Sequence, residues 1–410
     1  MQEMQAALEP AVSVQAKGLT RQDVMLLLLV LVFAALPVAP APAGIALALL
    51  MFFWVFSGTC WIERRLIWTQ DWFVPAMLLF ILPWVGLLWS PDIATGLKDA
   101  ERSVYWIYAL AAATVSYRRY APQLLVYAFL AGLSMNVVIS VLQCLQLLPM
   151  YKGQGYGFLN HITYSLLLVS GLLFIAYLYR KQQQRLVRFI LFVSMLMLTW
   201  NLAIGVSRAG YLAFILAIPW ILTVMFSRRQ IVWIVLCCLL AAGALAVSPI
   251  VRSRVVEIRK DIQQYQHGQG ATSIGLRFHM WEGAIKIWQA HPVLGAGTGG
   301  YRYALKEVID PSYAIFTHPH NSMLYLAVSY GTVGVIIFAW LVYVVLRRGW
   351  RARASVEGQI ILVFLFVIAV GSLTDTQIMN HVTGALLGFI SGLPIDGHSA
   401  EFDEGTKGNI

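Results

Sequence analysis

A short segment with two histidines, placed just before an apolar run, is the part of the sequence best suited to chemistry. Residues 318–321 read His-Pro-His-Asn, and the apolar run that follows contains Gly331 and Gly334. This pattern predicts that His320 lies at the first turn of a membrane helix, at the edge of the bilayer. The dipole of that helix disfavours an imidazolium ion, so a neutral ring is left to accept a proton. His318 is either a second functional group or the residue that orients the loop.

The residues around His320 also have expected structural roles. Asn321 and Ser322 are of types that cap a helix N-terminus. Gly331 and Gly334 allow a neighbouring helix to approach closely. The segment His291–Gly297 predicts a turn whose glycines likewise permit close backbone approach.

Two arginines are candidates for binding phosphate. Arg208 lies in the segment Ser207–Gly210, between two apolar runs with almost no loop around it, and Arg277 opens a helical pattern in the longest polar segment. A guanidinium group matches phosphate with paired donors. Arg208 has an alternative role as a snorkelling side chain at the lipid headgroups. Other cations compete with Arg277 for its role: Lys286, Arg302 and Lys306.

Asp375 is the lone acid before the last apolar run, and three roles are open to it. It orients a base, pairs with an arginine, or caps a helix. No carboxylate occupies a metal-ligand spacing beside the histidine pair, so we expect a mechanism without a metal ion. The glycines of residues 153–157 lack the Lys-Ser/Thr of a phosphate-binding loop. The sequence therefore predicts no cofactor, and the energy for any reaction must come from the substrate.

The elements that position these groups are membrane helices. The chain is 59% hydrophobic and only 12% charged, with a mean hydropathy of +0.72, whereas a soluble domain carries about 25% charged residues. Apolar runs of roughly 15–25 residues have the length of a spanning helix. The composition predicts an all-α integral membrane protein. The net charge of +10 comes from cations in every second loop, which indicates cytoplasmic loops rather than nucleic-acid binding.

Hydropathy and charge together predict twelve spans, with both termini in the cytoplasm. Their centres lie near Leu29, Leu49, Phe80, Leu110, Phe129, Leu167, Met195, Leu216, Leu236, Ile336, Phe364 and Leu387. Residues 1–250 then form a bundle of about nine spans, and residues 321–396 form one of about three. Residues 251–320 form one large outer loop, helical in part because Trp281, Ile285 and Trp288 recur at near-helical spacing. Residues 397–410 form a polar cytoplasmic tail.

The order of these groups resembles a known family. The arrangement is similar to that of the O-antigen ligase and O-antigen polymerase superfamily, which includes bacterial protein O-oligosaccharyltransferases. The groups that carry the resemblance are, in order, Ser207–Gly210, Arg277, the His291–Gly297 turn, and His320 with Asn321. The resemblance implies a GT-C-like glycosyltransferase in the bacterial inner membrane. Its active site would face the periplasm. It would need neither metal nor ATP, because a sugar pyrophosphate is already activated.

The resemblance also implies partners and residue roles. The donor would be an O-antigen glycan on undecaprenyl pyrophosphate, and the acceptor lipid A–core, within membrane lipids and with no nucleic acid; it implies no particular oligomeric state. The catalytic residues would be His320, Arg208 and Arg277, with His320 acting as a base or holding a phosphate. Candidates for substrate binding are Arg102, Asn160, His161, Arg302, His318, Asn321 and Asp375.

Three other functions compete with ligation. A polymerase or a protein O-oligosaccharyltransferase would use the same donor with another acceptor. The compact length and a single moderate loop without an appended domain favour the ligase. A lipid or glycan transporter, or a flippase, would place ionisable groups along a midplane path and show related halves. The sequence shows neither feature, since its polar candidates gather at one face.

Overall fold

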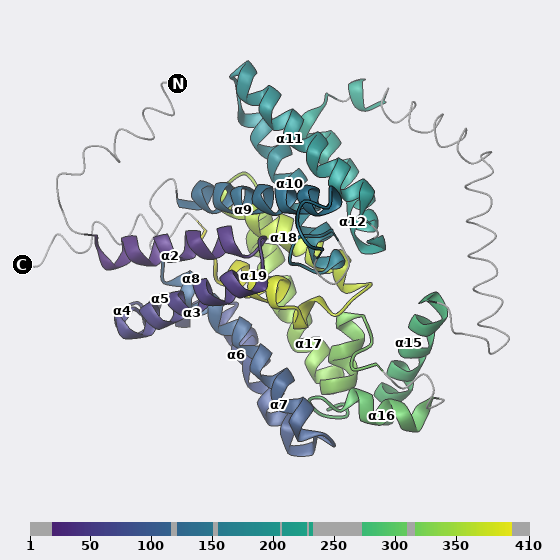
Figure 1. Cartoon of the computed structure of the whole chain (residues 1–410). Helices are drawn as coiled ribbons and strands as arrows, with labels where there is room; N and C mark the ends of the chain where they lie inside the picture. Colours follow the sequence, from purple (N-terminus) through teal and green to yellow (C-terminus); the bar gives the residue numbers. More distant parts are fainter. Residues whose placement is uncertain are drawn as a thin grey trace, which may run out of the picture.

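Figure 1 shows a computed structural model of the chain, and the part that it describes folds almost wholly as helices. The described residues are 19–115, 121–150, 155–205, 207–227, 229–232, 273–309 and 316–395. The first half contains α2 Arg21–Ala35, α3 Pro40–Phe56, α4 Thr59–Ile62, α5 Arg64–Trp68, α6 Phe73–Val85, η1 Gly86–Trp89, α7 Ile93–Glu101, η2 Arg102–Trp106, α8 Ile107–Ala113, α9 Ala121–Cys144, α10 His161–Lys181, α11 Arg185–Ile204 and α12 Arg208–Met225. The second half contains α15 Ser273–Ala290, α16 Tyr301–Val308, α17 Ser322–Arg351, α18 Val356–Ser372, η4 Gln377–Met379 and α19 His381–Gly392.

Several of these helices are suited to a membrane. Five of those in the described residues are long and apolar enough to cross one: α9, α10, α11, α12 and α17. The shorter apolar helices are α3, α6 with η1, α18 and α19. The fold is that of a multi-pass membrane protein, as the composition predicts. Twelve spans and a GT-C-like architecture stay predictions.

The expected spans and boundaries can be placed on these elements. All predicted span centres but one lie inside described helices, and the exception, Leu236, lies outside the described residues. The start of the predicted outer loop (residues 251–272) and the tail (residues 397–410) also lie outside them. Within the rest of that loop, the helix predicted around Trp281 is confirmed as α15.

The core is built around α10, which packs against α9, α11, α12 and α18. Of its most apolar window 78% is buried, against 17% for α11, so α10 is central and α11 peripheral. Aromatic rings join the core helices: Phe129 and Phe174 lie 5.1 and 5.3 Å from Phe364, and Phe33 lies 5.9 Å from Phe389. Such ring pairs stabilise packing beyond the area that they bury.

Helix α17 is broken at Gly331, where φ is 63° and ψ is −160°. The break receives the backbone of the turn at residues 291–300. Ala296 donates its N–H to the carbonyl of Val328 (2.7 Å), and Thr332 donates to the carbonyl of Pro292 (2.8 Å). A Cβ at Gly331 would lie 2.2 Å from a backbone oxygen of this turn. The expected close approach at Gly331 is therefore correct, but the partner is a glycine-rich turn rather than a helix.

The same turn also contacts the first half of the chain. The Thr298 hydroxyl donates to the carbonyl of Pro83 (2.6 Å), and Ser90 donates to the carbonyl of Thr298 (2.7 Å). Figure 1 shows α17 between α6 and α7 on one side and α15 and α16 on the other. The turn thus ties both neighbours to the helix that follows the histidine segment.

Candidate functional site

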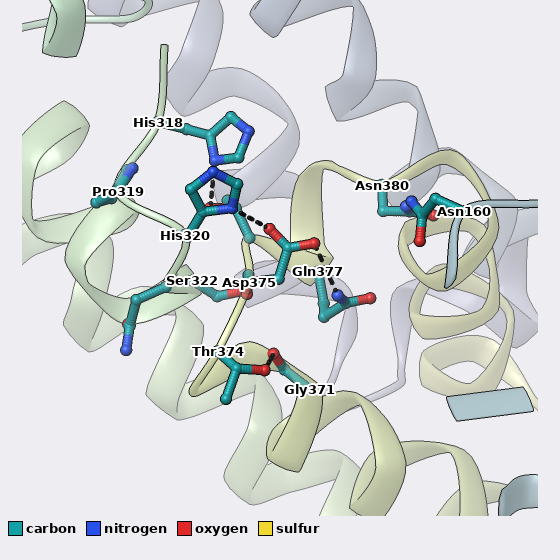
Figure 2. A network of polar contacts seen from close by, with 12 residues as sticks. Asn160, His318, Pro319, His320, Ser322, Gly371, Thr374, Asp375, Gln377 and Asn380 are labelled. Carbon is teal, nitrogen blue, oxygen red and sulfur yellow. Dashed lines mark hydrogen bonds and ion pairs between the residues drawn. The ribbon is translucent and has the colours of Figure 1, made fainter. Parts of the chain in front are cut away.

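The histidine segment meets Asp375 at the beginning of α17 (Figure 2). His320 Nδ1 lies 2.8 Å from Asp375 Oδ1, although the two residues are 55 positions apart in the sequence. The imidazole is 31% exposed and the carboxylate 14%, so the histidine is the more accessible member of the pair. His320 Nε2 forms no hydrogen bond to the described residues. The structure thus brings Asp375 into contact with the histidine, and its role as the residue that orients a base stays a prediction.

Local structure holds His320 just outside the helix rather than in its first turn. Asn321 is the N-cap of α17, and its side-chain oxygen accepts hydrogen bonds from the backbone N–H groups of Met323 and Leu324. His320 has a φ of 49°, a left-handed conformation that non-glycine residues rarely adopt and that concentrates at functional sites. Trp281 on α15 donates its indole N–H to the carbonyl of Pro319 (3.0 Å) and fixes the segment from the other side.

A second set of contacts fixes Asp375. Gln377 donates its amide to Asp375 Oδ2 (3.3 Å), and the Thr383 hydroxyl contacts the Gln377 amide oxygen (3.0 Å). Burial alone would raise the pKa of Asp375, but the hydrogen bond and charge of His320 and the Thr376 N–H outweigh burial and lower it. Sequence reasoning missed Gln377 and Thr383, and their only signal was proximity to Asp375 in a short polar stretch.

His318 is the second imidazole of the site. Its Nδ1 lies 3.2 Å from the Thr376 hydroxyl, and its ring centre lies 4.3 Å from that of His320. Burial and the charge of His320 lower the pKa of His318 to about 4, with Asp375 opposing and Arg102 reinforcing the effect. At neutral pH this ring is therefore uncharged.

The two histidines and Asp375 also form a possible metal site. Their ligand atoms all lie within 4.8 Å of one another. The expectation that no carboxylate stands beside the histidine pair was therefore wrong in space, because tertiary packing brings Asp375 there. The Nδ1 atoms of His318 and His320 are already held by Thr376 and Asp375. A bound metal would thus use the remaining nitrogens or displace these contacts.

The two predicted arginines enter the same region from different helices. Arg208 is the first residue of α12, whose N-cap Ser207 accepts a hydrogen bond from Ser165 of α10 (2.7 Å). Burial and the charge of Arg208 lower the pKa of Arg277 on α15, while Asp375 opposes them. No carboxylate in the described part of the chain forms an ion pair with either guanidinium. Arg208 at the N-terminus of α12 and Arg277 near the beginning of α15, neither of them in an ion pair with a described carboxylate, together offer positive charge to an anion.

The other predicted residues separate into three groups. His161, the first residue of α10, lies within electrostatic range of Asp375 and Arg277 and so belongs to the cluster. Asn160 caps α10 by accepting the Thr163 N–H (2.7 Å), which gives its side chain a structural role. Asn321 caps α17 as described above.

Arg102 and Arg302 lie apart from each other. Arg102 pairs with Asp99 (3.2 Å) and is close enough to affect the pKa of His318. Arg302 is exposed on α16, and the charge that it influences is that of Asp92, at the start of α7. Among the described residues, nothing brings Arg302 to the histidine cluster.

Comparison with known proteins assigns the class. A family model described as O-antigen ligase matches residues 192–339, which include Arg208, Arg277 and the histidine segment. An uncharacterized protein of Haemophilus influenzae is 27% identical over 156 residues, which cover 35% of this chain and 39% of that protein. This chain therefore matches less than half of the length of that relative.

The described helices are those of a multi-pass membrane protein, and part of the chain matches an O-antigen ligase family model. In residues 192–339, which are less than half of its length, the chain is similar to the O-antigen ligase family.

Proposed function

We propose that this protein is an inverting glycosyltransferase that completes lipopolysaccharide. It would move an O-antigen glycan from undecaprenyl pyrophosphate to lipid A–core in the periplasmic leaflet of the inner membrane. The observation that carries the proposal is the His320–Asp375 pair (2.8 Å), with Arg277 in electrostatic range of Asp375 and Arg208 in range of Arg277. The family match supports the general reaction type.

His320 acts as the general base in this proposal. Asp375 accepts the Nδ1–H of His320 and so leaves the lone pair on Nε2 for the acceptor. An acceptor hydroxyl gives its proton to Nε2 as its oxygen attacks the anomeric carbon. The bond between that carbon and the pyrophosphate oxygen breaks, and its electron pair leaves with the pyrophosphate. Attack opposite the leaving group inverts the anomeric centre, and general-base help of this kind contributes about 10²–10⁴-fold.

Arg208 and Arg277 stabilise the leaving group. Negative charge grows on the pyrophosphate as the bond breaks, and fixed cations aimed at developing charge lower the barrier. Arg277 on α15 lies within electrostatic range of both Asp375 and Arg208, the first residue of α12. The two arginines therefore supply the positive charge that a metal ion supplies in other transferases.

The test is a ligation assay with the purified full-length protein. Wild type, His320→Ala and His291→Ala are compared, the last because His291 is an exposed histidine. Each receives lipid-linked O-antigen and rough lipopolysaccharide, with EDTA and without ATP. We expect wild type and His291→Ala to transfer and His320→Ala to bind donor without transferring. A fully active His320→Ala would refute the base, and loss of wild-type activity in EDTA would instead assign a metal to the histidine cluster.

The acceptor is tested in the same assay. Parallel reactions offer a second lipid-linked glycan or a periplasmic protein in place of rough lipopolysaccharide. Transfer to the lipid-linked glycan alone would identify a polymerase, and transfer to protein alone an oligosaccharyltransferase. Either outcome would overturn the ligase assignment and keep the donor.

A further inference from the structure

A pocket with polar and aromatic walls surrounds Arg102. It has a volume of about 360 Å³ and lies between α7, η2 and α8 on one side and the start of α19 on the other. That volume falls within the range of about 300–1,000 Å³ for small-molecule sites. Its lining residues are Lys98, Glu101, Arg102, Val104, Tyr105, Tyr108 and His381.

The walls of this pocket are held by close packing. Glycines of α19 lie directly against η2: a Cβ at Gly384 would be 2.4 Å from the Tyr105 ring, and one at Gly388 would clash with the Tyr105 carbonyl. The Tyr105 ring lies 6.0 Å from the His381 ring in an edge arrangement. These contacts pack the aromatic wall of the pocket tightly against α19.

The pocket is coupled to the histidine site through Arg102. Its guanidinium pairs with Asp99 (3.2 Å), and Tyr325 on α17 donates its hydroxyl to the same carboxylate (3.3 Å). Tyr325 follows His320 by five positions at the start of α17. Arg102 is thus fixed to the helix that follows the proposed base, and it is near enough to His318 to affect its pKa.

The chemistry of the lining favours a sugar over a phosphate. Lys98 and Arg102 donate hydrogen bonds, Glu101 accepts them, and the tyrosine and histidine rings offer flat apolar faces. A pyranose has hydroxyls that both donate and accept, and it has an apolar ring face. Glu101 would repel a phosphate, and Arg102 is already paired with a carboxylate. The charges of the pocket therefore nearly cancel.

We propose that this pocket binds the terminal sugar of the acceptor glycan, an inference that rests on the proposed transferase function. Arg102 connects the pocket to the beginning of α17 through Asp99 and Tyr325, and it is close enough to His318 to affect its pKa. An acceptor sugar held by the pocket is therefore coupled to the helix that follows the proposed base.

Two variants test the pocket in different ways. Glu101→Gln removes an acceptor of hydrogen bonds with little change in shape, and Val104→Phe narrows the pocket without changing charge. Glu307→Gln is the matched control, because Glu307 is exposed on α16. With saturating donor and varied rough lipopolysaccharide, both pocket variants should raise the KM for acceptor at least about tenfold. Their KM for donor should stay within about twofold of wild type, as should both constants in Glu307→Gln.

A binding measurement separates this inference from the proposed reaction. Delipidated core oligosaccharide is titrated against the full-length protein and followed by saturation-transfer NMR. Binding to wild type and Glu307→Gln, but not to Val104→Phe, supports the pocket even if wild type transfers no glycan. An absence of binding to wild type, or an unchanged acceptor KM in both pocket variants, overturns it. A lower donor KM in Glu101→Gln also overturns it, because that result assigns the pocket to phosphate.

Discussion

Replacing Asp375 with asparagine tests the histidine–carboxylate pair with the smallest change in shape. The carboxylate accepts the Nδ1–H of His320 at 2.8 Å and is only 14% exposed, so water replaces it poorly. An asparagine has two ways to face Nδ1. It can present its NH₂ group, or it can present its amide oxygen, which lacks the negative charge that strengthens the hydrogen bond. In the first case the ring proton moves to Nε2, and the nitrogen that faces the acceptor can no longer accept a proton.

The size of the effect follows from these two cases. Loss of one charge-assisted hydrogen bond removes about 1.5–3 kcal/mol, which corresponds to a rate loss of about 10–150-fold. If the amide also fixes the wrong tautomer, the whole contribution of the base is lost, about 10²–10⁴-fold. We therefore expect Asp375→Asn to lower kcat by at least about tenfold while donor binding changes little.

The assay measures kcat with saturating donor and rough lipopolysaccharide, over a range of pH. Asp71→Asn is the matched control, because Asp71 is exposed in the turn before α6. If Asp375→Asn keeps wild-type kcat and pH profile, the pair has no catalytic role.

Two further predictions concern Arg208 and His318. Arg208→Lys should lower kcat/KM for donor at least about tenfold, because lysine keeps the charge but not the paired donors. The control is Arg185→Lys, because Arg185 is exposed. Equal activity of the two variants would mean that Arg208 acts only as a point charge. The pKa of His318 is lowered to about 4, whereas the unfolded chain binds its proton near pH 6.5. Folding therefore excludes this proton, and the stability that neutral His318 contributes is present above pH 6.5 and lost as pH falls towards 4, by up to about 3 kcal/mol. The measurement is thermal unfolding at several pH values. His318→Asn should reduce the loss of stability at low pH, and the control His291→Asn, at an exposed position, should not. If the stability of His318→Asn and of wild type changes with pH in parallel, His318 is not the source of this loss.

Much of the helical framework could be predicted because it depends on local pattern. Apolar runs of membrane length identify spans such as α10 and α17, and asparagine before an apolar run identifies the cap of α17. The break at Gly331 could not be predicted, because a glycine inside an apolar run is also common in intact membrane helices. Only the contact with the 291–300 turn shows why that glycine has a positive φ.

For the site, the sequence by itself determined the kinds of groups and the order in which they occur. A histidine before a helix cap and two arginines at helix starts already indicated proton transfer and phosphate binding. The tertiary structure alone decided which groups meet. It brought Asp375 to His320 across 55 positions and added Gln377 behind it, and it left Arg302 beside Asp92. The physical reason is that hydropathy and helical period act within one helix, whereas these contacts depend on how separate helices pack and turn against one another.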